Sequence, residues 1–385
     1  MNADFVLKGG RLVLGDEVVN GTLAVAGGRI VAVDSGSTST TGAMDVEDDL
    51  LIPGLVELHT DNLERHLMPR PGVRWPELAA LLAHDAEIVG AGITTVFDAF
   101  GVGDTDADAL RGMNWRDTIR CIEASTEQGI LRAEHRLHAR CELPAANAAT
   151  LFQPFIRHPL LGLVSLMDHT PGQRQWENID HARVFYTGKK QWSAEKFNQQ
   201  VEHQKAQQEQ YVIPHRAYFV DYARQHGLAL ASHDDTTAEH VRCAHDEGAV
   251  ISEFPTSVSA ARAARELGLA IVMGAPNAVR GGSHSGNVAT LDLARSGLLD
   301  ALSSDYVPAS LLMAPFLLVE QAGYSLPQAV ATVTVNPARV TGLTDRGVLA
   351  AGMRADMVQV RLVDKVGGGQ QPVVRAVWRA GSRVL

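Results

Sequence analysis

Residues 51–61 read Leu-Ile-Pro-Gly-Leu-Val-Glu-Leu-His-Thr-Asp, a Pro-Gly turn followed by an apolar run that ends in two metal-binding side chains. Alternate residues of a strand point to the same side, so we predict that His59 and Asp61 project together, with Leu58 and Thr60 on the other side. An imidazole and a carboxylate at this spacing could begin a binuclear metal site. A His-x-Asp triplet also occurs by chance in loops, so the rest of the chain has to decide.

Bulk composition limits the class of protein. With 385 residues, 45% of them hydrophobic, the chain can bury a large core, enough for one large α/β domain or a barrel with a smaller module. No apolar run approaches the roughly 20 residues of a membrane-spanning helix, and the N-terminus lacks a signal-peptide pattern, which predicts a cytoplasmic protein without a membrane partner. Three scattered cysteines fit a reducing compartment, and a net charge of -10 argues against a nucleic-acid partner.

Short strand-like runs separated by glycine-containing turns occur at both ends of the chain. Residues 1–52 carry four such runs, and two more flank the Gly-rich stretch 367–369 near the C-terminus. This alternation is typical of a small antiparallel sheet. We therefore predict a β-sandwich domain formed by residues 1–52 and 345–385, and a catalytic domain formed by residues 53–344.

Between the two ends, apolar strand-like segments alternate with helix-like stretches, which is the pattern of parallel strands joined by helical crossovers. Eight such segments predict an α/β fold of the (β/α)8 TIM-barrel type, with catalytic groups at the carboxyl ends of the strands. A doubly wound open sheet is the alternative, but the Gly-rich nucleotide turn that normally follows its first strand is absent. The predicted strands are residues 55–61, 93–100, 136–143, 163–169, 228–235, 249–254, 270–276 and 301–306.

Metal-binding side chains recur at the ends of several of these segments. Because the carboxyl ends of barrel strands surround one site, we expect these side chains to meet there. The predicted metal ligands are His59, Asp61, Glu142, His169, His233 and Asp305.

The third segment has an apolar face and a polar face, the polar one made of Arg136, His138, Arg140 and Glu142. In a barrel the apolar face packs on the outer helices and the polar face points inward, which brings Glu142 to the top of the interior. We predict that Glu142 bridges two metal ions. His138 and Arg140 are interpreted as a hydrogen-bonded layer that supports Glu142.

This ligand set combines imidazoles with carboxylates and contains no thiolate. It suits two divalent ions, with zinc favoured and manganese or iron as alternatives, and it argues against a structural zinc site. Two metal ions bridged by Glu142 and a hydroxide would supply a nucleophile at neutral pH. Asp305 is the predicted catalytic base, because it could ligate one metal and accept the proton of the attacking water. Asp234 and Asp235 are the next candidates for that base.

Two loops have the composition of anion-binding segments. Residues 274–286 combine glycines, which allow backbone N–H groups to approach an anion, with Arg, Ser and His side chains, in a sector where barrels commonly bind phosphate. Residues 62–76 carry three arginines among prolines that stiffen the loop. A plain flexible loop and ordinary surface arginines are the respective alternatives.

The longest interruption, residues 171–216, lies between the fourth and fifth predicted strands. Its part from Glu195 to Gln210 has a helical, largely polar pattern, which favours a solvated excursion. A lid or a contact in a homo-oligomer, bringing Lys189 toward the site, is the alternative. The predicted substrate-binding residues are Arg70, Lys189, Arg280, Gly281, Gly282, Ser283 and His284.

These features together resemble the amidohydrolase superfamily. The resemblance rests on the two-ended β-sandwich, on Pro53-Gly54 before the first ligand pair, and on the closing pattern of residues 336–356. The superfamily usually has His-x-His where this chain has His59-Thr60-Asp61, and often a carboxylated lysine where we place Glu142. By our count the bridging group and two later histidines also lie one strand earlier than usual.

Longer strings narrow the resemblance to the phosphonate-metabolism members of the superfamily, in the carbon-phosphorus lyase pathway. They span essentially the whole chain and include residues 57–63, 167–175, 231–235 and 280–287. The resemblance implies a metal-dependent diphosphatase that hydrolyses a ribosyl triphosphate to the 5-phosphate and pyrophosphate. It also gives the arginine and glycine loops a partner, the triphosphate of a phosphorylated sugar.

Two other readings remain open from the sequence. An amide or cyclic-amide hydrolase is the enzymatic alternative, because the same metal-activated water attacks carbonyl carbon in many superfamily members. A metal-stabilised binding protein is the non-enzymatic one, although it would have no need for Asp305 beside a metal-bound water.

Overall fold

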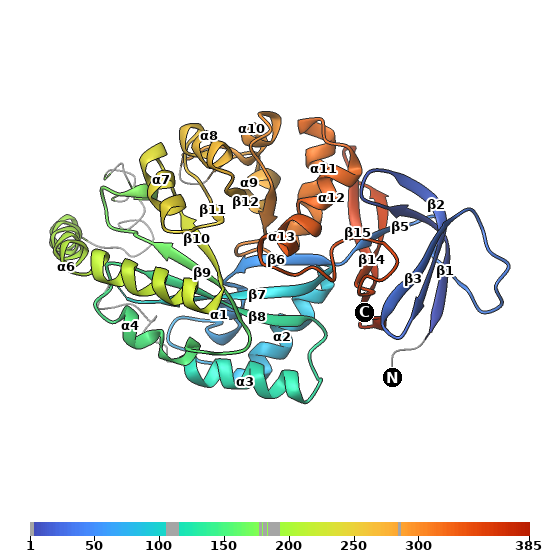
Figure 1. Ribbon diagram of the computed structural model, residues 1–385, viewed down its shortest axis with the longest axis horizontal. Coiled ribbons are helices and arrows are strands. Elements are labelled where there is room, and N and C mark those ends of the chain that lie inside the picture. The colour runs from blue at the N-terminus through green and yellow to red at the C-terminus, as the bar shows by residue number, and fades with distance from the viewer. Residues whose placement is uncertain (1–3, 105–114, 177–178, 180–182, 184–192, 284–285) are drawn as a thin grey trace.

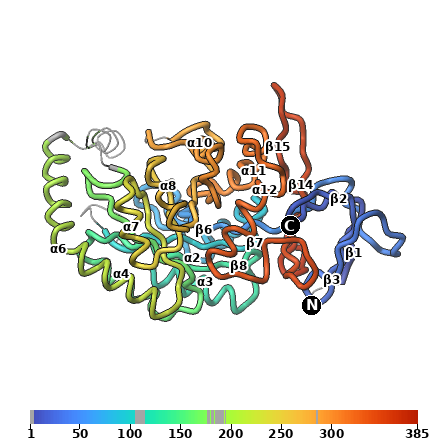
Figure 2. Tube along the Cα trace, turned by 45° about the horizontal axis from the view of Figure 1, so that its top comes forward, coloured from blue at the N-terminus to red at the C-terminus, as the bar shows by residue number. Residues whose placement is uncertain are grey.

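The structure, a computed structural model, describes residues 4–104, 115–176, 179, 183, 193–283 and 286–385. They form two sheets of eight strands each. The sheet of terminal strands lies at one end of the molecule and helix α6 (Ala194–His226) at the other, as both Figure 1 and Figure 2 show. Among the described residues, no helix has the length and apolar character needed to cross a membrane.

The larger sheet is an eight-stranded parallel barrel, as predicted from the alternating pattern. Its strands follow one another in sequence order, and every neighbouring pair from the first strand to the eighth is parallel. Each predicted segment overlaps one of them. The strands are β6 (Leu55–Thr60), β7 (Ile93–Val102), β8 (Glu134–Glu142), β9 (Leu161–Met167), β10 (Ala229–His233), β11 (Ile251–Glu253), β12 (Ala270–Gly274) and β13 (Ala301–Ser303).

The first and last barrel strands meet at the residues that the sequence singled out. Thr60 and Asp305 form a parallel bridge, and the Thr60 hydroxyl donates to the Asp305 carbonyl over 2.7 Å. This contact closes the barrel. It also holds the segment that carries His59 and Asp61 next to Asp305. Along the chain, His59 and Asp61 are 246 and 244 residues away from Asp305.

An apolar cluster fills the barrel interior below the site. It takes side chains from seven of the eight strands, including Val56, Phe97, Leu163 and Val272. Leu58 belongs to the same cluster, although the prediction placed it on the opposite side of the strand from His59, which lines the cavity above. The reason is that β6 pairs irregularly with β7, with a register shift between Glu57 and Thr60, and such irregularities break the strict alternation of a strand.

Helices surround the barrel and connect its strands. Two of them, α6 and α8, begin with a side-chain cap, Ser193 and Ser257, and end at a left-handed glycine. The helices are α1 (Asn62–Leu67), α2 (Glu77–Gly90), α3 (Trp115–Glu127), α4 (Ala148–Leu151), α6 (Ala194–His226), α7 (Ala238–Asp246), α8 (Val258–Leu267), α9 (Ala275–Arg280), α10 (Thr290–Arg295), α11 (Ser310–Ala322), α12 (Leu326–Ala331) and α13 (Val335–Val340), with 3-10 turns η1 (Gln153–Phe155) and η2 (Arg174–Trp176).

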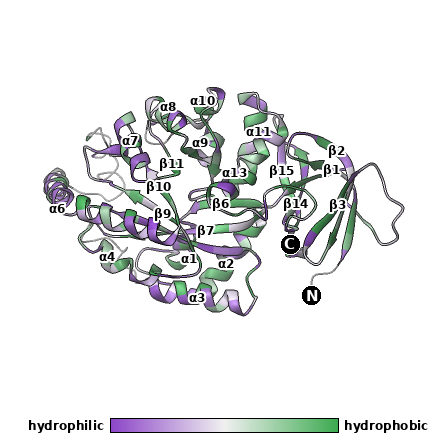
Figure 3. Cartoon of the chain, viewed as in Figure 1, coloured by the Kyte–Doolittle hydropathy of each residue, from purple (hydrophilic) through white to green (hydrophobic). Residues whose placement is uncertain are grey.

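Helix α6 contains the helical part of the long interruption. It runs for 33 residues, twice the length expected from the polar stretch, and much of its surface is hydrophilic (Figure 3). Its C-terminal half packs against the barrel through Phe219 and Ala223, which are buried in the main core. Lys189 lies outside the described residues, so its approach to the site stays a prediction.

The smaller sheet is built from both ends of the chain, as predicted. It is mixed, because β4 and β5 run parallel to β1 while the other pairs are antiparallel. Its strands are β1 (Phe5–Val13), β2 (Val18–Ala26), β3 (Arg29–Ser35), β4 (Met44–Asp45), β5 (Leu50–Pro53), β14 (Met357–Asp364), β15 (Gln370–Arg379) and β16 (Ser382–Arg383). The exact domain boundaries at residues 52 and 345 stay a prediction.

The closing pattern of the chain joins the two sheets. Arg346 and Arg354 both pair with Glu134 at the start of β8, and Arg354 also pairs with Asp356. Burial of Glu134 opposes its charge, but the two guanidinium groups hold its pKa at about 2. These ion pairs, which are mostly buried, therefore fix the terminal sheet against the barrel.

Candidate metal centre

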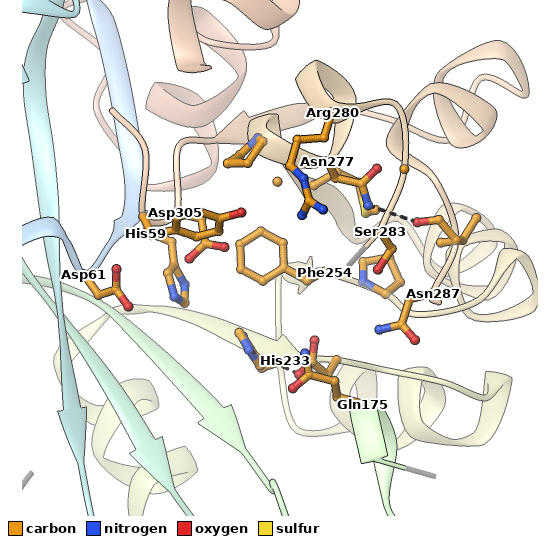
Figure 4. Close-up of a pocket in the computed structure, with 18 of the residues that line it drawn as sticks. His59, Asp61, Gln175, His233, Phe254, Asn277, Arg280, Ser283, Asn287 and Asp305 are labelled. Atoms are coloured by element: carbon orange, nitrogen blue, oxygen red, sulfur yellow. Dashed lines mark hydrogen bonds and ion pairs between the residues drawn. The ribbon is translucent and has the colours of Figure 1, made fainter. Parts of the chain in front are cut away.

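A cavity of about 570 Å³ opens at the carboxyl ends of the barrel strands. Five of the six predicted metal ligands line it, and the figure of the site shows His59, Asp61 and Asp305 on one side, with His233 below them (Figure 4). Phe254 lies between this group and the residues of α9 and its loop. The lining ligands are His59, Asp61, His169, His233 and Asp305.

Each of the three histidines in the cavity has its Nδ1 atom held by a carboxylate. The Nδ1 atoms of His59 and His233 lie 2.7 Å from the two oxygens of Glu253, and Nδ1 of His169 lies 2.5 Å from Glu142 Oε2. A carboxylate accepts hydrogen bonds, so each ring carries its proton on Nδ1 and presents the Nε2 lone pair. This is the arrangement that metal-binding histidines adopt in proteins.

Glu253 is a site residue that the sequence reasoning missed. It ends β11, is 1% exposed, and also accepts a hydrogen bond from Ser165 over 3.0 Å. Burial opposes its charge, but His59 and His233 hold its pKa well below the usual range. The signal that could have found it is the one used for His233 and Asp305, a polar residue at the end of an apolar strand.

Three ligand atoms converge without bonding to one another. Asp234 Oδ2 lies 3.5 Å from His233 Nε2 and 3.7 Å from His169 Nε2, and it is buried without a hydrogen-bond partner. A buried carboxylate oxygen facing two imidazole lone pairs is unfavourable unless a cation lies between them. His169, His233 and Asp234 therefore fit a divalent ion, with Asp234 as one of its ligands.

The backbone is strained where it presents these groups. Asp234, Phe254 and Asp305 have φ values of 56°, 54° and 52°, in the left-handed region that non-glycine residues rarely adopt. Asp234 directly follows β10, Phe254 directly follows β11, and Asp305 lies two residues after the end of β13. All three line the cavity. Such strain gathers at functional sites, where the rest of the fold holds it in place.

Two further carboxylates of the cavity, Asp61 and Asp305, lie near the start of helix α1. Burial and the negative charge of Asp61 raise the pKa of Asp305 to about 7. A carboxylate whose ionisation is opposed in this way is stabilised by a nearby cation. Burial also lowers the pKa of His59 to about 4, so its ring is neutral near pH 7, as metal binding requires. His59, Asp61 and Asp305 line the same side of the cavity, and their role as ligands of a second divalent ion stays a prediction.

Glu142 and His138 lie behind the cavity. Besides its contact with the His169 ring, Glu142 accepts a hydrogen bond from the His169 backbone N–H over 2.9 Å, so it positions this histidine. Its predicted role as a bridging ligand stays a prediction. His138 belongs to a buried polar layer, as predicted, but its hydrogen-bond partners are the Leu58 carbonyl and the Ser165 hydroxyl.

The predicted phosphate-binding residues are only partly brought together. Arg280, Gly282 and Ser283 line the cavity with Asn277 and Asn287, and Figure 4 shows Arg280 and Asn277 together on the side away from Asp61. The amides of Gly281 and Gly282 donate to carbonyls of α9, so they close that helix and leave side chains as the available donors.

Three other predicted substrate-binding residues either do not line the cavity or lie outside the described residues. Arg70 is exposed and forms a backbone bridge with Val73 in the loop that follows α1, outside the cavity lining. His284, like Lys189, lies outside the described residues. The roles of these three residues stay predictions.

The comparisons with known proteins agree with this architecture. A family model described as the amidohydrolase family matches residues 86–385. The chain belongs to this family. The amidohydrolase is 46% identical over 382 residues to alpha-D-ribose 1-methylphosphonate 5-triphosphate diphosphatase of Escherichia coli (strain K12), which covers 99% of this chain and 100% of that protein.

More distant relatives share the fold with other activities. Imidazolonepropionase of Deinococcus deserti is 25% identical over 400 residues, covering 95% of this chain and 91% of that protein. The crystal structure of N-acetyl-D-glucosamine-6-phosphate deacetylase from Mycobacterium smegmatis has a TM-score of 0.61 and 18% identity, covering 99% of this chain and 100% of that chain. At this identity the structural likeness supports the fold alone.

A second cluster of histidines and carboxylates lies outside the cavity, between the barrel and α2. Asp98 lies 2.7 Å from both His84 Nε2 and His135 Nδ1, the second nitrogen of His135 contacts Asp85, and that of His84 contacts Asn62. All four ring nitrogens have partners, so this cluster is a closed hydrogen-bond network, not a second metal centre. Asn62 follows Asp61, and the network therefore anchors the ligand loop to α2.

The position of Glu253 leads to a prediction about metal affinity. In a Glu253→Gln variant the amide oxygen can accept from only one histidine, while the NH2 group faces the other and favours the tautomer with its proton on Nε2. That tautomer cannot bind a metal ion through Nε2, so we expect metal affinity to fall by about 10–100-fold. Titration against a chromophoric chelator measures it. Glu239→Gln, at an exposed position on α7, is the control, and equal affinity in the two variants would contradict the role of Glu253.

Proposed function

We propose that this amidohydrolase hydrolyses alpha-D-ribose 1-methylphosphonate 5-triphosphate to the corresponding 5-phosphate and pyrophosphate. The observation that carries the proposal is one cavity that combines three histidines, oriented by carboxylates, with the side chains of Arg280, Asn277 and Ser283. The histidines suit metal-dependent activation of water, and the side chains of Arg280, Asn277 and Ser283 suit binding of an anionic substrate. The Escherichia coli relative, similar over its whole length, supplies the identity of that substrate.

The cofactor we propose is a pair of divalent metal ions, with zinc favoured. His169, His233 and Asp234 would hold one, and His59, Asp61 and Asp305 the other. When bound, such ions lower the pKa of water and polarise phosphoryl oxygens. Glu142 and Glu253 would keep the histidine rings in the required orientation.

The reaction breaks one anhydride bond and needs one water molecule. Water oxygen forms a bond to phosphorus, the P–O bond of the anhydride between the first and second phosphoryl groups breaks, and pyrophosphate leaves. Asp305 accepts the proton of the attacking water, because its carboxylate faces the cavity beside Asp61. Arg280 and Asn277 bind phosphoryl oxygens at the opposite side, which keeps the chain of phosphates in line with the attack.

The proposed function is tested with protein reconstituted with zinc, manganese or iron. We expect pyrophosphate release from the ribosyl triphosphate and no turnover of a panel of linear and cyclic amides. The same assay with nucleoside triphosphates tells whether the ribosyl phosphonate is required. Turnover of an amide without pyrophosphate release would reject the proposal in favour of an amide hydrolase.

Arg280 provides the first test of the anion-binding side. Charge-assisted hydrogen bonds contribute about 1.5–3 kcal/mol, so Arg280→Ala should lower kcat/KM for the triphosphate by about 10- to 100-fold, with metal content unchanged. Arg262→Ala on α8 removes the same charge from an exposed position outside the cavity and serves as the control. Unchanged efficiency in Arg280→Ala would make the α9 loop structural only.

A further inference from the structure

Arg140 is the one cationic side chain that β8 contributes to the cavity wall. Its side chain is only 12% exposed, and its buried Nε has no hydrogen-bond partner. The nearest carboxylate, Asp61, lies 4.0 Å from Nη1, which is beyond a direct hydrogen bond. A guanidinium group is always charged and has five donors, so a nearly buried one with unsatisfied donors at a cavity requires an explanation.

Other buried or half-buried arginines of the described chain show what a structural role looks like. Arg136, two alternations earlier on the same face of β8, pairs with Glu134 at 2.9 Å and lies over the ring of Phe97. Arg174 donates to the His233 carbonyl and to Asp235, each over 2.6 Å. Both side chains are held by partners within the fold, whereas the donors of Arg140 have none at hydrogen-bond distance.

Arg140 lines the same cavity as the proposed metal ligands His59, His233 and Asp305. A permanent cation placed among metal ligands repels the ions that those ligands would bind. A triphosphate brings further anionic charge into the same cavity, which offsets this repulsion.

We propose that Arg140 is a further catalytic residue, whose guanidinium group donates hydrogen bonds to the non-bridging oxygens of the phosphoryl group under attack. This inference rests on the proposed function. Arg280 binds the phosphate chain from the α9 side, and Arg140 lies on β8 beside Asp61, so the two cations contact different parts of the substrate. Negative charge on the phosphoryl oxygens must be stabilised as the bond breaks, and donors fixed beforehand do so without reorganisation.

The test compares Arg140→Ala and Arg140→Lys with the wild type, with Arg262→Ala as the charge-matched control. We expect Arg140→Ala to lower kcat by about 10²–10³-fold with a smaller change in KM, and to retain its metal content. Arg140→Lys should recover only part of the loss, because an ammonium group lacks the planar fork. Added guanidinium ion should partly restore the activity of Arg140→Ala and leave that of the control unchanged.

A second readout does not depend on turnover. Affinity of the metal-loaded protein for inorganic pyrophosphate, measured by calorimetry, should fall by at least tenfold in Arg140→Ala and stay unchanged in Arg262→Ala. Three results would overturn the proposal: wild-type kcat in Arg140→Ala, loss of metal in both Arg140 variants, or an additional metal ion bound by Arg140→Ala. The last would mean that Arg140 takes the place of a metal ion. A wild-type protein inactive on the ribosyl triphosphate would instead reject the proposed function, which separates the two failures.

Discussion

An Asp305→Asn variant should retain most of its metal and turn over the triphosphate about 10²–10⁴ times more slowly than the wild type. The amide oxygen of asparagine can still coordinate a metal ion, but it cannot readily accept the proton of the attacking water. The change is small in volume, and the backbone contact from Thr60 to the Asp305 carbonyl remains. Metal analysis and steady-state kinetics on the same preparation measure both quantities.

Two comparisons make this result interpretable. Asp292→Asn changes an exposed carboxylate on α10 and should behave as the wild type. Near-normal turnover of Asp305→Asn would assign the base elsewhere. Asp235 is a poor second candidate, because Arg174, Ser232 and Ser252 bond to its carboxylate, so Asp234 would be the residue to substitute next.

The second large effect concerns stability. Asp98→Asn removes the carboxylate that joins His84 and His135 in the buried network beside α2, and leaves the positive charge of His135 with Asp85 alone. Breaking a buried ion pair by removing one partner typically costs about 3–5 kcal/mol. We therefore expect the free energy of unfolding to fall by about that amount near pH 6, measured by urea denaturation.

The pH dependence of this contribution follows from two shifts of opposite sign. Burial disfavours the charge on His135, but Asp98 and Asp85 raise its pKa from 6.5 to about 9, so its contribution is complete below 6.5 and is lost as pH rises through 9. Burial also opposes the charge on Asp98, but His135 and His84 lower its pKa from 3.8 to about 2, so its contribution is complete above 3.8 and is lost as pH falls through 2. The network stabilises the fold most between these limits.

The variant therefore has a characteristic profile. Wild type should lose stability between pH 6.5 and 9 through His135, and Asp98→Asn should lose less over the same range, so the two curves approach each other at alkaline pH. Asp221→Asn, in an exposed pair with Arg224, is the control and should follow the wild type. Parallel curves for wild type and Asp98→Asn would show that His135 is not charged in the folded protein.

The sequence was sufficient for the barrel and for placing most of the predicted metal ligands in one cavity. Hydrophobic periodicity is a local property, so the eight strands could be found one by one, and the geometry of a parallel barrel then brings their carboxyl ends together. His59, Asp61, His169, His233 and Asp305, which line one cavity, follow from this reasoning. The direction in which the Leu58 side chain points did not follow from it, because the register shift in β6 depends on pairing with β7 and leaves no local pattern in the sequence.

The residues that contact those predicted ligands were decided by the tertiary structure. Glu253 joins His59 and His233, which are 194 and 20 residues away along the chain, and Asp234 faces His169 and His233 because a left-handed residue turns the chain after β10. Arg140 was expected to support Glu142, whereas its donors border the cavity. Periodicity predicts which way a strand residue points. The partner that it meets there depends on the order and stagger of all eight strands, and only the folded chain sets these.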